Sequence, residues 1–338
     1  MKKFVAILLT LMLVLGIGAA VADEAPATPT TYKDMPTVTI TKNYELTNEG
    51  TVSPTETFNF TIAANSVTDA AEDVTVANMP MPTIGSVTYV DGEAGSATKS
   101  KTVEISLPDY TSVGIYTYII KETAGTTAGV TYYGKDILLK VTVIEQGGKI
   151  RVAAVHTEEG HSGTGDNKKD TFANTYEAGT LNVTKTVAGN LGDQSKKFDF
   201  TVKFTKPDGK DVNSTITATV AGVGATNFNI AWDDKGTYTY TFQLAHGQKA
   251  SFANLPYGVT YTVTEAAAEG YTTKVGETAT SEVKGSIDAA TQTEAFTNTK
   301  TGSIDTGVTT ENLPYVLLIG FVVLAGAALL IKRKAHNN

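Results

Sequence analysis

The chain has 338 residues, a net charge of −8 and no cysteine, with 41% hydrophobic and 18% charged residues. This length suggests about two domains with buried cores, and the absence of cysteine excludes disulfides, thiolate catalysis, cysteine-ligated zinc and iron–sulfur clusters. A negative net charge with only two arginines argues against a nucleic-acid partner.

The N-terminus has the layout of a secretory signal peptide. Lys2 and Lys3 precede an apolar run from Phe4 to Leu15. The small-x-small sequence Ala20-Val21-Ala22 follows, which predicts cleavage after Ala22 and a signal peptide over residues 1–22. An N-terminal membrane anchor is the alternative, but the apolar run is short for a membrane span. The mature chain is therefore expected to be secreted.

Four short motifs occur twice, in the same order, along the body of the chain. The pairs are 38–42 with 181–185, 58–62 with 198–202, 116–122 with 259–265, and 172–175 with 296–299. Each motif alternates apolar and polar residues, which is the period of a half-buried strand. Repetition in order indicates two copies of one unit, over residues 33–177 and 178–300, with extra length in the first copy between Val130 and Asp170. We therefore expect an all-β fold of two tandem Ig-like sandwiches.

Each unit directs one lysine, one glutamate and one asparagine toward its core. Side chains two residues apart on a strand share a face, and these polar residues share faces with apolar neighbours. They are Lys42, Glu122 and Asn174 in the first unit, and Lys185, Glu265 and Asn298 in the second. A buried charge costs several kcal/mol unless it is paired, so this pattern needs an explanation.

Three interpretations of these six residues are open. They could lie in solvent at strand ends, or form buried Lys–Glu ion pairs with asparagine as a hydrogen-bond partner. The third interpretation is covalent, because burial lowers the pKa of a lysine and raises that of a glutamic acid. A neutral lysine amine is a nucleophile, and a protonated glutamic acid polarises the asparagine carbonyl, so the amine displaces ammonia and forms an amide. The match of residue type and order in both copies favours the covalent interpretation.

The C-terminal end has three successive parts within residues 301–338. Thr306-Gly307 precedes an apolar segment over 313–331, and Lys332-Arg333-Lys334 follows it. The apolar segment is just long enough for a transmembrane helix, and the basic tail marks its cytoplasmic side. This order resembles the sorting signal of sortase substrates in Gram-positive bacteria. The usual pentapeptide there is Leu-Pro-x-Thr-Gly, whereas the sequence here is Ser-Ile-Asp-Thr-Gly. A plain membrane anchor, which would leave a membrane-retained protein, is the alternative.

The second copy carries the most specific stretch of the chain. Residues 252–265 read Phe-Ala-Asn-Leu-Pro-Tyr-Gly-Val-Thr-Tyr-Thr-Val-Thr-Glu. Together with the repeated lysine, glutamate and asparagine, this stretch resembles the two-domain major pilins of Gram-positive bacteria, whose domains are related to CnaB-type repeats of collagen-binding adhesins. The resemblance covers residues 33–331, although the first copy has only Ser106-Leu107-Pro108 near the Leu-Pro-x-Gly position. It implies spontaneous isopeptide bonds, Lys42–Asn174 assisted by Glu122 and Lys185–Asn298 assisted by Glu265.

The same resemblance implies how subunits would be joined. A pilin-type sortase would cut between Thr306 and Gly307 and transfer the Thr306 carbonyl to a lysine of the next subunit. In the family this lysine lies in the first domain, shortly before the strand with the bonded asparagine. The corresponding stretch here is 158–170, which is polar and rich in glycine. Lys168 is the preferred acceptor and Lys169 the alternative.

The expected function is structural rather than enzymatic. The chain would be a subunit of a covalently polymerised pilus, exposed on the cell surface and anchored to the cell wall. Its expected partners are other copies of itself, a pilin-type sortase, minor pilins and peptidoglycan, and no cofactor or metal is expected. The alternative is a monomeric wall-anchored adhesin with CnaB-type stalk domains, which would give a single band rather than a ladder in boiled surface extracts.

Overall fold

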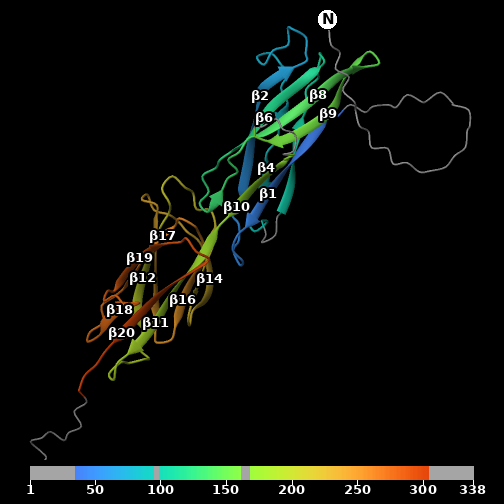
Figure 1. The fold of residues 1–338 in the computed structure, drawn as a ribbon. Coiled ribbons are helices and arrows are strands. Elements are labelled where there is room, and N and C mark those ends of the chain that lie inside the picture. Colours follow the sequence, from blue (N-terminus) through green and yellow to red (C-terminus); the bar gives the residue numbers. More distant parts are fainter. Residues whose placement is uncertain (1–34, 95–98, 161–167, 304–338) are drawn as a thin grey trace, which may run out of the picture. The chain divides into compact units, whose positions relative to one another are not determined.

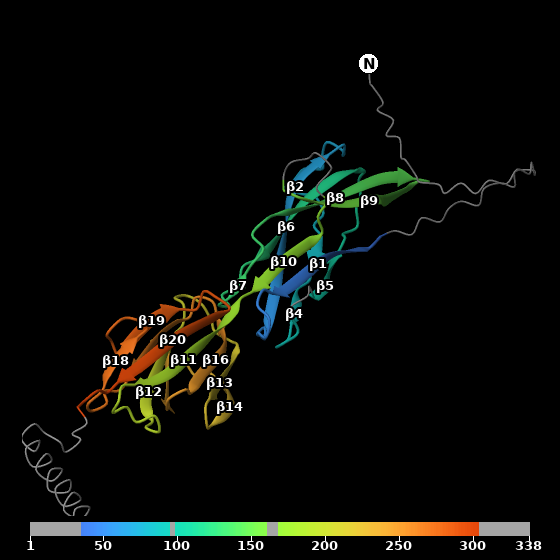
Figure 2. The same cartoon turned by 60° about the horizontal axis from the view of Figure 1, so that its bottom comes forward.

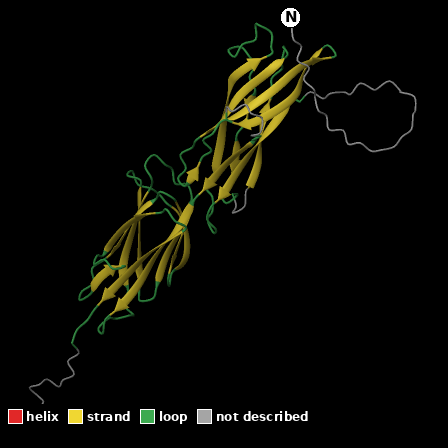
Figure 3. Ribbon diagram, in the orientation of Figure 1, coloured by secondary structure: helices red, strands yellow, loops and turns green. Residues whose placement is uncertain are grey.

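A computed structural model describes residues 35–94, 99–160 and 168–303. This part of the chain folds into twenty strands in four sheets (Figures 1 and 3). Within it, no helix has the length and apolar character needed to cross a membrane. The expected signal peptide, the segment 313–331 and its basic tail all lie outside the described residues.

The first ten strands form two five-stranded sheets around one core. The sheet orders are β3-β5-β1-β10-β7 and β4-β2-β6-β8-β9. The strands are β1 (Thr37–Leu46), β2 (Glu56–Thr68), β3 (Thr83–Ile84), β4 (Val87–Tyr89), β5 (Lys99–Ser106), β6 (Gly114–Thr123), β7 (Val130–Thr131), β8 (Ile137–Gln146), β9 (Lys149–Glu159) and β10 (Thr171–Tyr176). Both sheets contribute to the core, for example Ile40 and Val103 from one and Phe58 and Tyr116 from the other.

The last ten strands form a second pair of sheets with its own core. The orders are β14-β13-β16-β11-β20-β18 and β15-β12-β17-β19. The strands are β11 (Ala178–Ala188), β12 (Phe198–Thr205), β13 (Thr215–Val220), β14 (Gly224–Asn229), β15 (Thr237–Leu244), β16 (Lys249–Pro256), β17 (Thr260–Glu265), β18 (Thr272–Val275), β19 (Glu282–Ser286) and β20 (Thr291–Thr299). Leu181 and Phe252 meet Phe200 and Val263 in this core. The structure therefore confirms the all-β fold and the two tandem sandwiches.

Period-two patterning explains why these segments form strands. In β12, Phe198, Phe200, Val202 and Phe204 are buried, while the residues between them are exposed or half-buried. Because alternate side chains of a strand point to opposite faces, this sequence buries one face and leaves the other in water. All eight repeated motifs lie on strands, in β1, β2, β6 and β10 of the first sandwich and in β11, β12, β17 and β20 of the second.

The extra length of the first copy forms a β-hairpin. β8 and β9 pair antiparallel and follow β6 in the sheet order, whereas only β19 follows β17 in the second sandwich. The turn between them is Gly147-Gly148, with φ angles of 62° and 76°. Glycine adopts positive φ without steric cost, so this dipeptide is suited to a tight hairpin turn.

Each sandwich pairs its first strand with its last strand in parallel (Figure 2). β1 lies beside β10, and Lys42 is opposite Phe172. β11 lies beside β20, and Lys185 is opposite Phe296. In both pairs the asparagine stands two residues beyond the position opposite the lysine, so each lysine and asparagine meet on one face of the sheet. This register positions the candidate site.

Candidate functional site

In the first sandwich the predicted lysine, glutamate and asparagine form one connected cluster. Lys42 and Asn174 come from adjacent strands of one sheet, and Glu122 comes from β6 in the facing sheet. The Lys42 Nζ donates to Glu122 Oε2 at 2.7 Å, and Asn174 Nδ2 donates to Glu122 Oε1. The two oxygens of a single carboxylate thus contact the nitrogens of both other side chains.

This cluster is completely removed from water. Lys42 and Asn174 are 0% exposed, as is the side chain of Glu122. The Phe58 ring lies 4.2 Å from Lys42 Nζ. Burial disfavours the charged amine and lowers the pKa of Lys42 to about 8, although the Glu122 carboxylate works in the opposite direction. About a tenth of this lysine is therefore neutral at pH 7.

The second sandwich repeats the cluster. Lys185 Nζ donates to Glu265 Oε2 at 2.7 Å, and Asn298 Nδ2 donates to Glu265 Oε1. These side chains are buried to 1% exposure or less. Burial lowers the pKa of Lys185, against the opposing effect of Glu265. The burial of both clusters excludes the interpretation that the six residues lie in solvent at strand ends.

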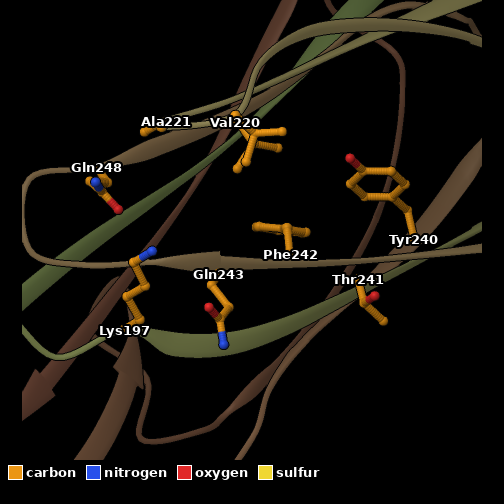
Figure 4. A pocket seen from close by; sticks show the side chains of 10 residues that line it. Lys197, Val220, Ala221, Tyr240, Thr241, Phe242, Gln243 and Gln248 are labelled. Atoms are coloured by element: carbon orange, nitrogen blue, oxygen red, sulfur yellow. The ribbon is translucent and has the colours of Figure 1, made fainter.

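Aromatic side chains separate the second cluster from the surface. Phe198 and Phe200 lie 4.2 Å and 5.6 Å from Lys185 Nζ, and Phe242 stacks on Phe200 with ring centroids 5.4 Å apart. The outer side of Phe242 faces a surface groove of about 310 Å³. Figure 4 shows Phe242 there with Val220, Tyr240, Lys197, Gln243 and Gln248 around it, and no member of the cluster lines this groove. This groove therefore gives no access to the buried lysine.

The two clusters differ at the asparagine oxygen. Asn174 Oδ1 accepts a hydrogen bond of 2.9 Å from the backbone N–H of Tyr133. Asn298 Oδ1 is buried and has no hydrogen-bond partner among the described residues. Sequence analysis did not predict the hydrogen bond from the Tyr133 N–H to Asn174, because a backbone N–H is not specific to any residue type. It also expected the glutamate beside the asparagine carbonyl, whereas both glutamates contact the amide nitrogen.

The candidate acceptor lysines follow β9. Lys168 forms an isolated antiparallel bridge with Glu158 and is exposed. Lys169 is half-buried, and its backbone N–H donates to Thr157 O at 3.2 Å. Residues 161–167 of the predicted acceptor loop lie outside the described residues, as do Thr306 and Gly307. Lys168 is therefore the more exposed of the two candidate lysines.

Families of known domains match both sandwiches. The family described as Spy0128-like isopeptide containing domain matches residues 38–177, and a domain family of unknown function matches residues 179–300. A pilin of Streptococcus pyogenes serotype M1 is 31% identical over 319 residues, which is 88% of this chain and 90% of that protein. The pilus tip adhesin Cpa of Streptococcus pyogenes is 29% identical over 133 residues, or 39% of this chain and 18% of the adhesin.

Solved structures of pilins have a similar fold. The crystal structure of a major pilin from Streptococcus pyogenes is 26% identical with a TM-score of 0.53, covering 79% of this chain and 99% of that chain. The major pilin T3.2 from Streptococcus pyogenes serotype GAS13637 has the same TM-score and coverage at 22% identity. At 22% identity, the similarity to the T3.2 pilin concerns the fold alone.

Proposed function

Because this chain belongs to the major pilins of Gram-positive bacteria and is a structural subunit of a cell-surface pilus, we propose that an intramolecular isopeptide bond closes each of its sandwiches. The bonds are Lys42–Asn174 and Lys185–Asn298. The observation that carries this proposal is the buried contact of one carboxylate with both reacting nitrogens in each sandwich. A buried Lys–Glu ion pair alone would not require an asparagine, yet an asparagine occupies the same place in both sandwiches.

The geometry supports a proton relay through the glutamate. The neutral Lys42 amine attacks Cγ of Asn174 and forms the new C–N bond. Glu122 Oε2 accepts the proton that the attacking nitrogen loses, and the carboxylic acid so formed gives that same proton to Nδ2 of Asn174, which has a free lone pair once Cγ is tetrahedral. The bond from Cγ to Nδ2 then breaks and ammonia leaves. One proton passes from lysine to the leaving group, so the carboxylate ends as it began.

The mass of the purified protein tests the proposal. The mature chain over residues 23–306 should be lighter than its sequence by two molecules of ammonia, one for each bond. Glu122→Ala should restore one ammonia mass, and Glu265→Ala should restore the other. Full sequence mass in the parent protein would leave only the buried ion pairs.

Glu56→Gln is the matched control for these changes. Glu56 is also a buried glutamate of the first sandwich, 7% exposed. Its carboxylate accepts from Thr127 Oγ1 at 2.5 Å and from Tyr132 OH at 2.7 Å, neither of which belongs to the Lys42 cluster, although its charge acts to raise the pKa of Lys42. This variant should keep both bonds and therefore both losses of ammonia. If it retained its full sequence mass, the cause would be a general folding defect rather than a missing proton relay.

We further propose that a pilin-type sortase joins the subunits. It would cut between Thr306 and Gly307 and attach Thr306 to Lys168 of the next copy. Exposure of Lys168 favours it over the half-buried Lys169. The same signal would attach the completed fibre, with its minor pilins, to peptidoglycan. The apolar segment 313–331 would hold each subunit in the membrane until the sortase acts.

A further inference from the structure

We propose that the backbone N–H of Tyr133 is an oxyanion donor for the first isopeptide bond, and that the second bond forms more slowly without such a donor. The inference rests on the proposed isopeptide chemistry. It concerns a hydrogen bond in which the two clusters differ, the one to the asparagine oxygen.

Attack by lysine converts the planar amide carbon of asparagine into a tetrahedral centre. Its oxygen takes on negative charge at that point, and a hydrogen-bond donor already aimed at the oxygen stabilises the transition state. The Tyr133 N–H lies 2.9 Å from Asn174 Oδ1, which is within the range for such a donor. Because Asn174 is 0% exposed, its oxygen is shielded from water, and the hydrogen bond is stronger than it would be in solvent.

The orientation of the Asn174 amide follows from its two neighbours. Nδ2 donates to the Glu122 carboxylate, and Oδ1 accepts from the Tyr133 N–H. A rotated amide would place its oxygen against the carboxylate and its NH₂ group against an N–H donor. Both contacts would then be repulsive. The oxygen of Asn174 is therefore held at the donor, and its nitrogen is held at the relay.

Strand pairing explains why the Tyr133 N–H is available. β7 pairs with β10 only through Thr131 opposite Thr175 and Val130 opposite Tyr176. The ladder ends before it reaches Asn174, so the chain beyond β7 leaves the sheet. The N–H of Tyr133 is then directed at a side chain instead of at a strand.

Side-chain contacts hold Tyr133 in place. Its ring packs edge-on against Phe172 with centroids 5.0 Å apart. Its hydroxyl donates to Glu159 Oε1 at 2.5 Å, at the end of β9. The ring of Tyr133 is thereby fixed beside the core, and its hydroxyl is fixed at the neighbouring sheet. A donor held in this way needs little reorganisation during the reaction.

The second sandwich closes the same region differently. β18 pairs with β20 from Thr272 to Val275, and Thr273 lies directly opposite Asn298. The β18–β20 ladder therefore continues past Asn298, whereas the β7–β10 ladder ends before it reaches Asn174. Asn298 Oδ1 is left buried with no hydrogen-bond partner among the described residues. The developing negative charge at this oxygen would form without the donor that the first site has.

Replacement of the Tyr133 N–H by an ester oxygen tests the role of this donor directly. Cell-free translation with stop-codon suppression would insert the α-hydroxy acid that carries the tyrosine side chain. The loss of ammonia at each site is followed by mass spectrometry of the cross-linked peptides against time after synthesis. In the parent chain the first bond should form faster than the second. The ester should slow the first bond by about 10²-fold and leave the rate of the second unchanged.

The matched control inserts the same α-hydroxy acid at Tyr110, a tyrosine of the first sandwich whose side chain contacts Tyr116 and Tyr118. It should form the first bond at close to the parent rate. An ester at Tyr133 that leaves the first bond at the parent rate would overturn the inference, as would a parent in which both bonds form at one rate. If neither bond forms in the parent, the proposed isopeptide chemistry itself fails, which is a different result.

A second measurement does not require the ester variant to fold. Lys42→Met prevents the first bond while leaving Glu122, Asn174 and Tyr133 in place. In this protein the Tyr133 amide hydrogen should exchange slowly with solvent. Adding Asn174→Leu should make that hydrogen exchange at least several-fold faster, because its acceptor is gone. Equal exchange in the two proteins would show that the donor does not contact the asparagine, and would overturn the inference.

Discussion

Asn174 stands two residues beyond the position opposite Lys42 on a parallel neighbouring strand, and Asn298 stands in the same relation to Lys185. These strands are the first and last of each sandwich. An amide bond at this place therefore encloses nearly the whole sandwich instead of one hairpin.

Loss of the second bond should lower the stability of the second sandwich substantially. By the loop-closure model for disulfides, a bond that closes a loop on the order of 100 residues contributes about 4–5 kcal/mol. A suitable comparison is Lys185→Met with Glu265→Gln, which removes the bond and both buried charges together. A single Glu265→Ala change would also leave Lys185 unpaired, at about 3–5 kcal/mol of its own. Calorimetry should show an earlier transition for the double variant, and an unchanged transition would count against a covalent closure.

The rate of the first bond should follow the titration of Lys42. Its pKa of about 8 means that the neutral amine increases about tenfold between pH 7 and pH 9 and then levels off. The rate at which a freshly synthesised chain forms the first bond should show the same rise and plateau as the pH increases. A rate that continues to rise toward pH 10.5, the ordinary value for lysine, would indicate an amine that is not desolvated before it reacts.

Stability of the unbonded first sandwich should increase as pH rises from about 8 to 10.5. In Asn174→Ala the bond cannot form, and the burial that lowers the pKa of Lys42 should remain. Between the two pKa values the unfolded chain binds more protons than the folded chain, so raising the pH favours the folded state. The difference between these pKa values corresponds to about 3 kcal/mol. Urea unfolding of Lys42→Met with Asn174→Ala provides the control, and the added pH dependence should be absent from it.

The sequence predicted the six buried polar residues because strand parity is a strong signal. Lys42 and Glu265 each follow apolar residues at a spacing of two, and the structure buries both. Repetition supplied further support, because the same three residue types occur in the same order in both copies and give six matched positions. The all-β fold followed from the same alternation, since each motif buries one face of a strand.

Other features of the sites depend on pairing that the sequence does not encode locally. The parallel register between β1 and β10 joins residues far apart in the chain. The early end of the β7 ladder, which releases the Tyr133 N–H, depends on how two strands meet and not on a residue type. Lys168 and Lys169 differ in exposure, which the sequence of two adjacent identical residues does not indicate.

Polymerisation should depend on Lys168. Lys168→Ala should leave monomers in boiled surface extracts, because the sortase would lack its acceptor amine. Lys169→Ala is the matched control one residue later, with the same loss of charge, and it should still give a ladder of large species. The reverse pattern would move the acceptor to Lys169. Ladders in the double variant would show that the acceptor lies outside residues 158–170.

Tension in a fibre should act unequally on the two bonds. If force enters at Lys168 and leaves at Thr306, the path crosses from β10 into β11 and reaches Lys185. The second bond then transmits force directly to Asn298, and the strands between them carry no load. Most of the first sandwich precedes the entry point, so its bond serves mainly to stop β10 from being peeled away.

Single-molecule pulling between residues 168 and 306 should reveal this difference. Lys185→Met with Glu265→Gln should add a long extension, at most about 3.3–3.6 Å for each residue released between β11 and β20. Lys42→Met with Glu122→Gln should add little extension, although it should make the first sandwich easier to unfold by heat. The two variants are matched in chemistry and differ only in which bond is absent. A larger added extension from the change in the first sandwich would show that the proposed load path through β10, β11 and the second bond is wrong.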